Sequence, residues 1–217
     1  MEIKTRVFVI KRDVSGEKDG FFVVFSREYG KLMVKAKSTK KLLSRMQGNI
    51  EPFSLNDYVL VRRNGERGVF TLIQAAGISG FSGIRGSIKK MAFFYEAVEL
   101  IDIFFQLEDE NKGMFDTVLK SFEFVEKEDE EKISRAHLFF KTRLLKTAGF
   151  DITQNTGFFL NSKTGAQARD CIYEALSSDI AGCAASAQLN EEALKVLDYY
   201  ITMHADRDIK SRRLLRR

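Results

Sequence analysis

The sequence predicts an α+β protein, with an N-terminal five-stranded OB-fold β-barrel followed by a mainly helical C-terminal domain. Short β-rich segments separated by turns fill the first 76 residues, and beyond Ser87 apolar residues recur at helical steps of three and four. The 217 residues are enough for two small domains, each with its own core. We therefore expect an OB-fold domain over residues 1–79 and a helical domain over residues 80–217.

The five expected strands are runs of β-branched, aromatic and aliphatic residues with turn residues between them. They cover residues 6–11, 20–25, 32–36, 58–62 and 69–75. Asn64-Gly65 is a hairpin signal between the last two. Five short strands in fewer than 80 residues suit a small closed barrel, for which the OB-fold is the leading candidate. An SH3-like barrel fits the same pattern nearly as well.

Five helices are expected in the second half of the chain. Glycines at 77, 80, 83 and 86 precede them, and no Gly-Lys-Ser/Thr follows, so we interpret this segment as an interdomain link rather than a phosphate-binding loop. The helices are predicted at residues 88–105, 115–122, 133–148, 166–177 and 190–205. Ile88, Met91 and Tyr95 belong to the apolar stripe of the first, and Gly149 is a stop signal for the third.

Charge is distributed unevenly along the chain. Residues 1–80 carry 15 Lys/Arg and 8 Asp/Glu, residues 81–205 carry 14 and 20, and the last twelve residues carry 6 and 2. An acidic middle between two basic ends indicates modules with different partners. A basic barrel is compatible with nucleic acid as one of them.

Catalytic and metal-binding signals are nearly absent. His137 and His204 are the only histidines, and Cys171 and Cys183 are the only cysteines and form no CxxC pair. We therefore expect no enzyme, no catalytic residue, no cofactor and no metal. Glu96, Glu99 and Asp102 share one face of a helix, where salt bridges between domains or N-cap bonds are a better interpretation than a Mg²⁺ site. Without an apolar leader or a span long enough for a bilayer, the protein is expected in the cytoplasm and not in a membrane.

The strongest positive signal is a basic segment that leaves the third expected strand. It runs from Lys35 to Arg45, and no acid occurs between Glu28 and Glu51. Lysines and small hydroxyls on a loop beside a barrel suit a nucleic-acid backbone. The predicted DNA-binding residues are Lys35, Lys37, Lys40, Lys41 and Arg45. Phe8, Phe22 and Tyr29 are candidates for base stacking if exposed, although alternation along a strand places many such rings in the core.

The chain resembles the bacterial recombination mediator RecO family nearly from end to end. The motifs that carry the resemblance are, in order, Thr5-Arg6-Val7-Phe8-Val9-Ile10, Phe25-Ser26-Arg27-Glu28-Tyr29-Gly30-Lys31, Ala36-Lys37-Ser38-Thr39-Lys40-Lys41, Glu51-Pro52-Phe53-Ser54, Tyr95 with Glu99, Phe140 through Gly149-Phe150, and Ile209-Lys210-Ser211-Arg212-Arg213-Leu214-Leu215. Their order and spacing together make the match specific. Many members carry a four-cysteine zinc site after the Gly-aromatic helix end, and here residues 151–170 form a shortened region without cysteine.

The resemblance implies an OB-fold protein of DNA repair and recombination that binds single- and double-stranded DNA and anneals complementary strands. It also implies work with RecR and with the acidic C-terminal tail of single-stranded DNA-binding protein (SSB), to load recombinase onto coated single strands at the nucleoid. Two alternatives stay open. One is an adaptor whose basic tail, including Lys210, Arg212 and Arg213, grips an acidic protein segment with little DNA affinity. The other is an OB-fold RNA-binding protein.

Overall fold

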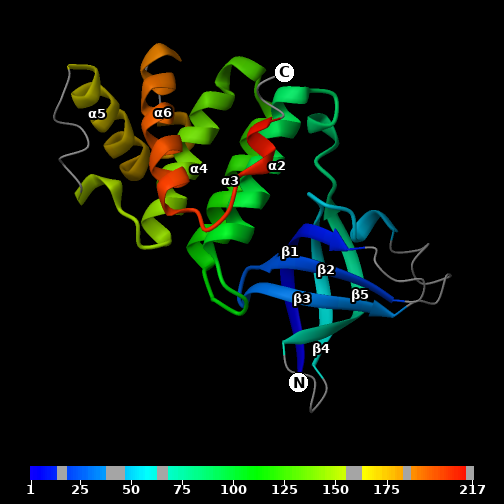
Figure 1. Ribbon diagram of the computed structural model, residues 1–217. Coiled ribbons are helices and arrows are strands. Elements are labelled where there is room, and N and C mark those ends of the chain that lie inside the picture. The colour runs from blue at the N-terminus through cyan, green and yellow to red at the C-terminus, as the bar shows by residue number, and fades with distance from the viewer. Residues whose placement is uncertain (14–18, 38–46, 63–67, 155–162, 183–186, 214–217) are drawn as a thin grey trace. The chain divides into compact units, whose positions relative to one another are not determined.

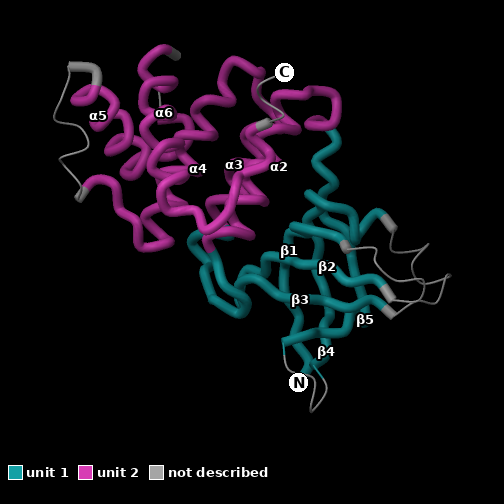
Figure 2. The backbone as a smooth tube through the Cα atoms, in the orientation of Figure 1, with its two compact units in different colours: residues 1–82, 105–115 teal, residues 83–104, 116–217 magenta. Residues whose placement is uncertain are grey.

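The computed structural model describes residues 1–13, 19–37, 47–62, 68–154, 163–182 and 187–213. It divides into two compact units, coloured separately in Figure 2. The first, here called the barrel unit, is Met1–Ser82 with Phe105–Phe115. The second, the helical unit, is Gly83–Phe104 with Asp116–Arg217. The chain first passes between them in the glycine-containing segment that the sequence indicated as a link.

Five strands close into the barrel (Figure 1): β1 (Glu2–Asp13), β2 (Asp19–Ser26), β3 (Gly30–Lys37), β4 (Leu55–Val61) and β5 (Val69–Ser79). The order around the barrel is β1-β2-β3-β5-β4. β3 and β5 run parallel, and the other neighbours run antiparallel. This is an OB-fold-like arrangement in an α+β protein, so the predicted fold class is confirmed. Four of the five predicted strands lie wholly within an observed one, and the fourth only overlaps β4, running one residue past its end.

The barrel interior follows from alternation along the strands. Phe22 and Val24 of β2, Val34 of β3 and Phe70 of β5 are almost fully buried in one cluster. Tyr58 of β4 belongs to the same cluster, and its hydroxyl donates a hydrogen bond to the carbonyl of Asn49 in the 3₁₀ turn η1 (Gln47–Asn49). Because neighbouring residues of a strand point to opposite sides, the residues between these lie on the outside of the barrel.

One end of the outer barrel surface is covered by residues 105–115, which return to the barrel after a long helix. The ring of Phe105 lies 5.9 Å from that of Phe25, and the ring of Phe115 lies 4.9 Å from that of Phe8. All four rings are buried. The predicted boundary at residue 79 does not include this return, because Phe105 and Phe115 are 80 and 107 residues away from their partners Phe25 and Phe8 in the sequence.

Gly30 makes close approach of the returning segment possible. It opens β3 with a positive φ of 65°, and a Cβ there would meet the backbone carbonyl of Asp109 at 1.8 Å. Beside it, the backbone N–H of Glu108 donates to the carbonyl of Lys31 at 2.8 Å. Only glycine satisfies both the backbone conformation and the space.

The helical unit contains α2 (Ile88–Phe104), most of α3 (Lys112–Lys127), α4 (Ile133–Thr147), α5 (Lys163–Ser177) and α6 (Ala187–His204). Short 3₁₀ turns lie between or after them: η2 (Ser82–Ile84), η3 (Glu130–Lys132), η4 (Ile152–Gln154), η6 (Ile180–Gly182) and η7 (Lys210–Arg213). Aromatic rings of α2, α3 and α4 fill the core, with Phe94 and Phe122 stacked at 3.7 Å. The five helix predictions are confirmed, and Gly149 ends α4 with a φ of 84° as predicted.

The apolar stripe predicted for α2 is only partly buried. Ala92 and Val98 of the stripe are buried, whereas Ile88 is 81% exposed and Tyr95 is 41% exposed. Phe93, Phe94 and Leu100, which lie off the stripe, are buried as well. The helix is apolar around most of its circumference, so a three- and four-residue period does not select one face. Packing against the other helices of the unit decides which residues are covered.

Candidate functional site

An outer surface of the barrel, here called the β2–β3–β5 face, consists of Phe21 and Val23 of β2, Met33 and Lys35 of β3, and Val69 and the buried Thr71 of β5. Two rows of paired residues cross it. In one row Phe21 pairs with Lys35 and Lys35 with Thr71. In the other Val23 pairs with Met33 and Met33 with Val69. The face is therefore largely apolar, with an aromatic ring and an ammonium group side by side in one row.

Phe21 and Lys35 form the chemically distinctive pair on this face. The ring of Phe21 is 37% exposed, and Nζ of Lys35 lies 5.7 Å from its centre. This distance is within the range of a cation–π contact. Along β2 the outward residues change from fully buried Phe25 to exposed Phe21, because residues 105–115 cover only the Phe25 end. The open end presents a flat ring next to a positive charge.

Two of the aromatic residues proposed for base stacking are in the wrong place for it. Phe8 is 1% exposed and Phe22 is 2% exposed, and Tyr29 packs partly buried against the barrel core. Phe22 lies inside because its neighbours on β2 alternate, and the same alternation turns Phe21 outward. Phe21 was missed because sequence alone does not say which of two adjacent phenylalanines faces the core.

The predicted DNA-binding residues begin at this face. Lys35 is half-buried on it, and Lys37 is the last residue of β3, with its side chain outside the described part of the structure. Lys40, Lys41 and Arg45 also lie outside the described residues. The chain order alone places the basic segment directly after the strand that carries Lys35. Its role in binding DNA stays a prediction.

Two arginines elsewhere on the barrel are paired with acids. Arg6 lies 2.9 Å from Asp57, and Arg12 lies 2.7 Å from Glu51. The hydrogen bond to Asp57 raises the pKa of Arg6. These two guanidinium groups therefore have their charge balanced by acids of the barrel unit.

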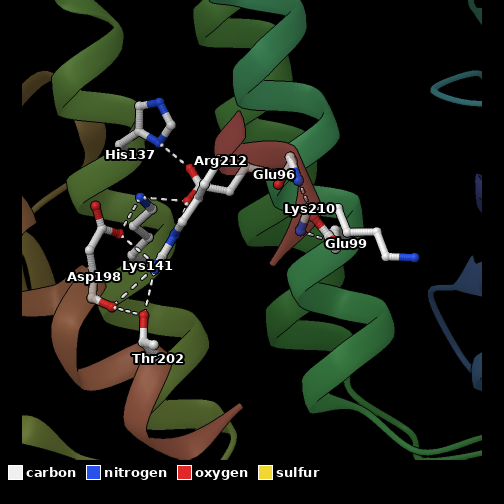
Figure 3. A network of polar contacts seen from close by, with 9 residues as sticks. Glu96, Glu99, His137, Lys141, Asp198, Thr202, Lys210 and Arg212 are labelled. Carbon is white, nitrogen blue, oxygen red and sulfur yellow. Dashed lines mark hydrogen bonds and ion pairs between the residues drawn. The ribbon is translucent and has the colours of Figure 1, made fainter. Parts of the chain in front are cut away.

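The helical unit contains a second polar arrangement, the charge cluster, formed by Glu96 of α2, His137 and Lys141 of α4, Asp198 of α6 and Arg212 of η7 (Figure 3). Nζ of Lys141 lies 2.9 Å from Oε1 of Glu96 and 2.7 Å from Oδ1 of Asp198. Arg212 lies 3.4 Å from Glu96 and 3.0 Å from Asp198. Nδ1 of His137 lies 3.2 Å from the other Glu96 oxygen. Two carboxylates and two cations balance one another around a neutral imidazole.

Burial and charge act in opposite directions on the acid of the cluster. Burial alone would raise the pKa of Glu96, but Lys141 and His137 outweigh it and hold that pKa well below its usual value. For His137, burial and then the charge of Lys141 lower the pKa, against the opposing effect of Glu96. Glu96 is therefore ionised and His137 is neutral near pH 7.

The acidic row on α2 binds the end of the chain within the same unit. Glu96 contacts Arg212, Glu99 accepts hydrogen bonds from the backbone N–H groups of Lys210 and Ser211 at 2.8 Å each, and Asp102 lies 2.6 Å from Arg207. The salt-bridge interpretation is confirmed for Glu96 and Asp102, although inside one unit rather than between two. Glu99 instead accepts backbone hydrogen bonds.

The residues predicted for binding an acidic partner have different surroundings. The side chain of Lys210 is exposed and points away from the charge cluster in Figure 3. Arg212 is only 21% exposed, and its guanidinium is engaged by Glu96, Asp198 and Thr202. The side chain of Arg213 lies outside the described residues. Partner binding by this segment stays a prediction.

Within the described residues, no group of three or more His, Cys, Asp or Glu side chains is arranged to hold a metal ion. Cys171 is a buried cysteine of α5. The cysteine-free region at 151–170 contains η4 and the start of α5, and residues 155–162 lie outside the description. None of the helices that the structure describes is both long enough and apolar enough to cross a bilayer.

Comparison with known proteins places this chain among proteins of DNA repair and recombination. Residues 1–81 match the family described as Recombination protein O N terminal, and residues 85–166 match Recombination protein O C terminal. Together the two matches span most of the chain, which belongs to the RecO family.

Relatives from several bacteria agree with this assignment. A protein named DNA repair protein RecO from Caldanaerobacter subterraneus is 24% identical over 97% of this chain and 96% of its own length. One of the same name from Clostridium novyi is 23% identical over 96% and 91%. The match with the Alkaliphilus metalliredigens relative is 27% identical and spans 69% of this chain and 59% of that protein.

Proposed function

We propose that this protein acts in DNA recombination and repair by binding DNA on the β2–β3–β5 face and along the basic segment that follows it. The observation that carries the proposal is the exposed ring of Phe21 with the ammonium group of Lys35 beside it. The face formed by strands 2 and 3 is where OB-folds bind oligonucleotides. An exposed ring accepts an unpaired base by stacking, and an adjacent cation contacts the phosphate backbone.

The basic segment extends the electrostatic part of this interface. Lys35, Lys37, Lys40, Lys41 and Arg45 would contact phosphates, each displacing condensed counterions. Five such contacts to a single strand give a slope of about −3.5 in a plot of log affinity against log salt concentration. The apolar residues of the face contribute a part of the affinity that depends little on salt.

Family membership supports a more specific role as a recombination mediator. In this role the protein binds single- and double-stranded DNA, anneals complementary strands, and acts with RecR and the SSB tail to load recombinase onto coated single strands. Annealing requires no catalytic residue, since a basic surface that screens two phosphate backbones lowers the repulsion between them. On this proposal the protein works in the cytoplasm, at the nucleoid.

The test is fluorescence anisotropy of a labelled single-stranded oligonucleotide, titrated with the full chain at several salt concentrations. Submicromolar binding with a steep salt slope supports the proposal, and binding that is weak and independent of salt contradicts it. A duplex and an RNA of the same sequence, run in parallel, separate the DNA role from that of an RNA-binding protein. Annealing of SSB-coated complementary strands, with and without RecR, then tests the mediator role.

A further inference from the structure

The segment from Arg207 to Arg213, here called the C-terminal clasp, runs antiparallel to α2. Its contacts follow α2 toward the N-terminus of that helix. Arg207 forms an ion pair with Asp102, the backbone N–H groups of Lys210 and Ser211 donate to Glu99, and Arg212 forms an ion pair with Glu96. These are three acids at successive helical steps on one face of α2 (Figure 3 shows the last two levels). The clasp is thus a basic segment bound to an acidic track of its own unit.

Binding of the clasp occupies cationic groups that a polyanion would otherwise contact. The guanidinium of Arg207 is paired at 2.6 Å with Asp102, and that of Arg212 with Glu96 and Asp198. The Glu99 carboxylate accepts hydrogen bonds from the backbone N–H groups of Lys210 and Ser211, the first two residues of η7. In the bound clasp, Arg207 and Arg212 are thus paired with acids of their own unit, whereas the side chain of Lys210 is exposed.

The helical unit retains paired charges when the clasp leaves. Glu96 keeps Lys141 and His137, and Asp198 keeps Lys141 at 2.7 Å. The outer contact of the clasp is also accessible to water, because Arg207 is 52% and Asp102 is 22% exposed. An exposed ion pair contributes little stability and weakens with salt. After release, Glu96 and Asp198 share Lys141, and the side chain of Asp198 is 38% exposed, so water partly solvates its charge.

We propose that the C-terminal clasp is an autoinhibitory contact that withholds Arg207 and Arg212 from DNA, and that its release lets these two residues contact DNA phosphates. The inference rests on the proposed DNA-binding function and adds its regulation. Each added phosphate contact to a single strand steepens the log–log salt slope by about 0.7. Two contacts therefore steepen it by about 1.4 and tighten binding roughly tenfold or more at about 50 mM salt.

The experiment uses Glu99→Ala in the full chain, since this change removes the acceptor of two clasp hydrogen bonds and substitutes no residue of the charge cluster. Glu191→Ala is the matched control, because it removes one exposed acid of α6 and changes the net charge equally. Hydrogen exchange of residues 207–213 and single-strand binding at several salt concentrations are both measured. We expect faster exchange in the clasp and tighter, more salt-dependent binding for Glu99→Ala alone.

A second variant tests whether the released cations of the clasp cause the gain in DNA affinity and salt dependence. Glu99→Ala with Arg207→Ala should lose about half of the added salt slope, since one of two released guanidinium groups is gone. Unchanged exchange in Glu99→Ala overturns the clasp as a releasable element. Faster exchange with binding equal to that of Glu191→Ala overturns autoinhibition while the wild type still binds DNA. Absence of DNA binding by wild type and variants alike overturns the proposed function, and this inference with it.

Discussion

Nζ of Lys141 lies 2.9 Å from Oε1 of Glu96, and both side chains are almost completely removed from water. Lys141 is the cation nearest to the buried charge of Glu96. Lys141 also lies 2.7 Å from Asp198, which in turn lies 3.0 Å from Arg212. These shared contacts determine which substitutions the helical unit tolerates.

Replacing only one partner of the buried pair should be strongly destabilising. Lys141→Met leaves Glu96 ionised without its nearest cation, and we expect a loss of about 3–5 kcal/mol in the free energy of unfolding. The double variant Lys141→Met with Glu96→Leu removes both charges, and the Arg212–Asp198 pair remains. It should be more stable than Lys141→Met alone. Urea titrations of both variants test this, and a double variant less stable than the single one would contradict the account.

The charge cluster also makes stability depend on pH. His137 has a lowered pKa in the folded state, so below its usual value of about 6.5 the unfolded chain binds a proton that the folded chain does not. The free energy of unfolding should then fall with decreasing pH, by at most about 1.4 kcal/mol per pH unit from this one group. Glu96 also has a lowered pKa, and its contribution is lost only below its usual value of 4.5.

His137→Gln removes the titrating ring, so the slope of stability against pH between about 6.5 and 5 should become flatter in the variant. Chemical denaturation at a series of pH values measures it. An unchanged slope would mean that His137 does not cause the acid sensitivity in this range. The variant's absolute stability at pH 7.5 is the reference from which each slope is taken.

Gly30→Ala should destabilise the barrel unit. The left-handed backbone conformation costs an L-residue about 1–2 kcal/mol, and the added Cβ would also meet the Asp109 carbonyl. Together these effects should cost on the order of 3 kcal/mol. Gly68→Ala is the control, because Gly68 has a φ of 78° but nothing within 4 Å of an added Cβ, so its cost should be about 1 kcal/mol. Equal losses for both variants, measured by thermal unfolding, would refute the close approach.

Local pattern predicted most elements of this fold but not how the strands and helices are covered. The apolar run in residues 20–25 predicts a strand, whereas the pairing of Phe21 with Lys35 decides that Phe21 faces outward and Phe22 faces the core. The buried position of Phe25 depends on residues 105–115, which no local period connects to it. Which of these phenylalanines are buried therefore depends on contacts between segments that are far apart in the sequence.

The acidic row on α2 illustrates the same limit for the polar residues. Its spacing predicted that Glu96, Glu99 and Asp102 share a face, and the structure agrees. Its partners are more than a hundred residues away in the sequence, in a tail that composition alone described as basic. A carboxylate that is 1% exposed also violates the expectation that charged residues lie at the surface.

The most direct test of the central claim compares single-strand DNA affinity of Lys35→Glu and Phe21→Ala with that of Lys4→Glu. Lys4 is exposed on β1, where it pairs with Val59 of β4, so Lys4→Glu makes the same charge change away from the β2–β3–β5 face. We predict that Lys35→Glu weakens binding and flattens the salt slope by about 0.7 or more. Phe21→Ala should weaken binding by about 1–3 kcal/mol with little change in slope. If both variants bind as Lys4→Glu does, the β2–β3–β5 face is not where DNA binds.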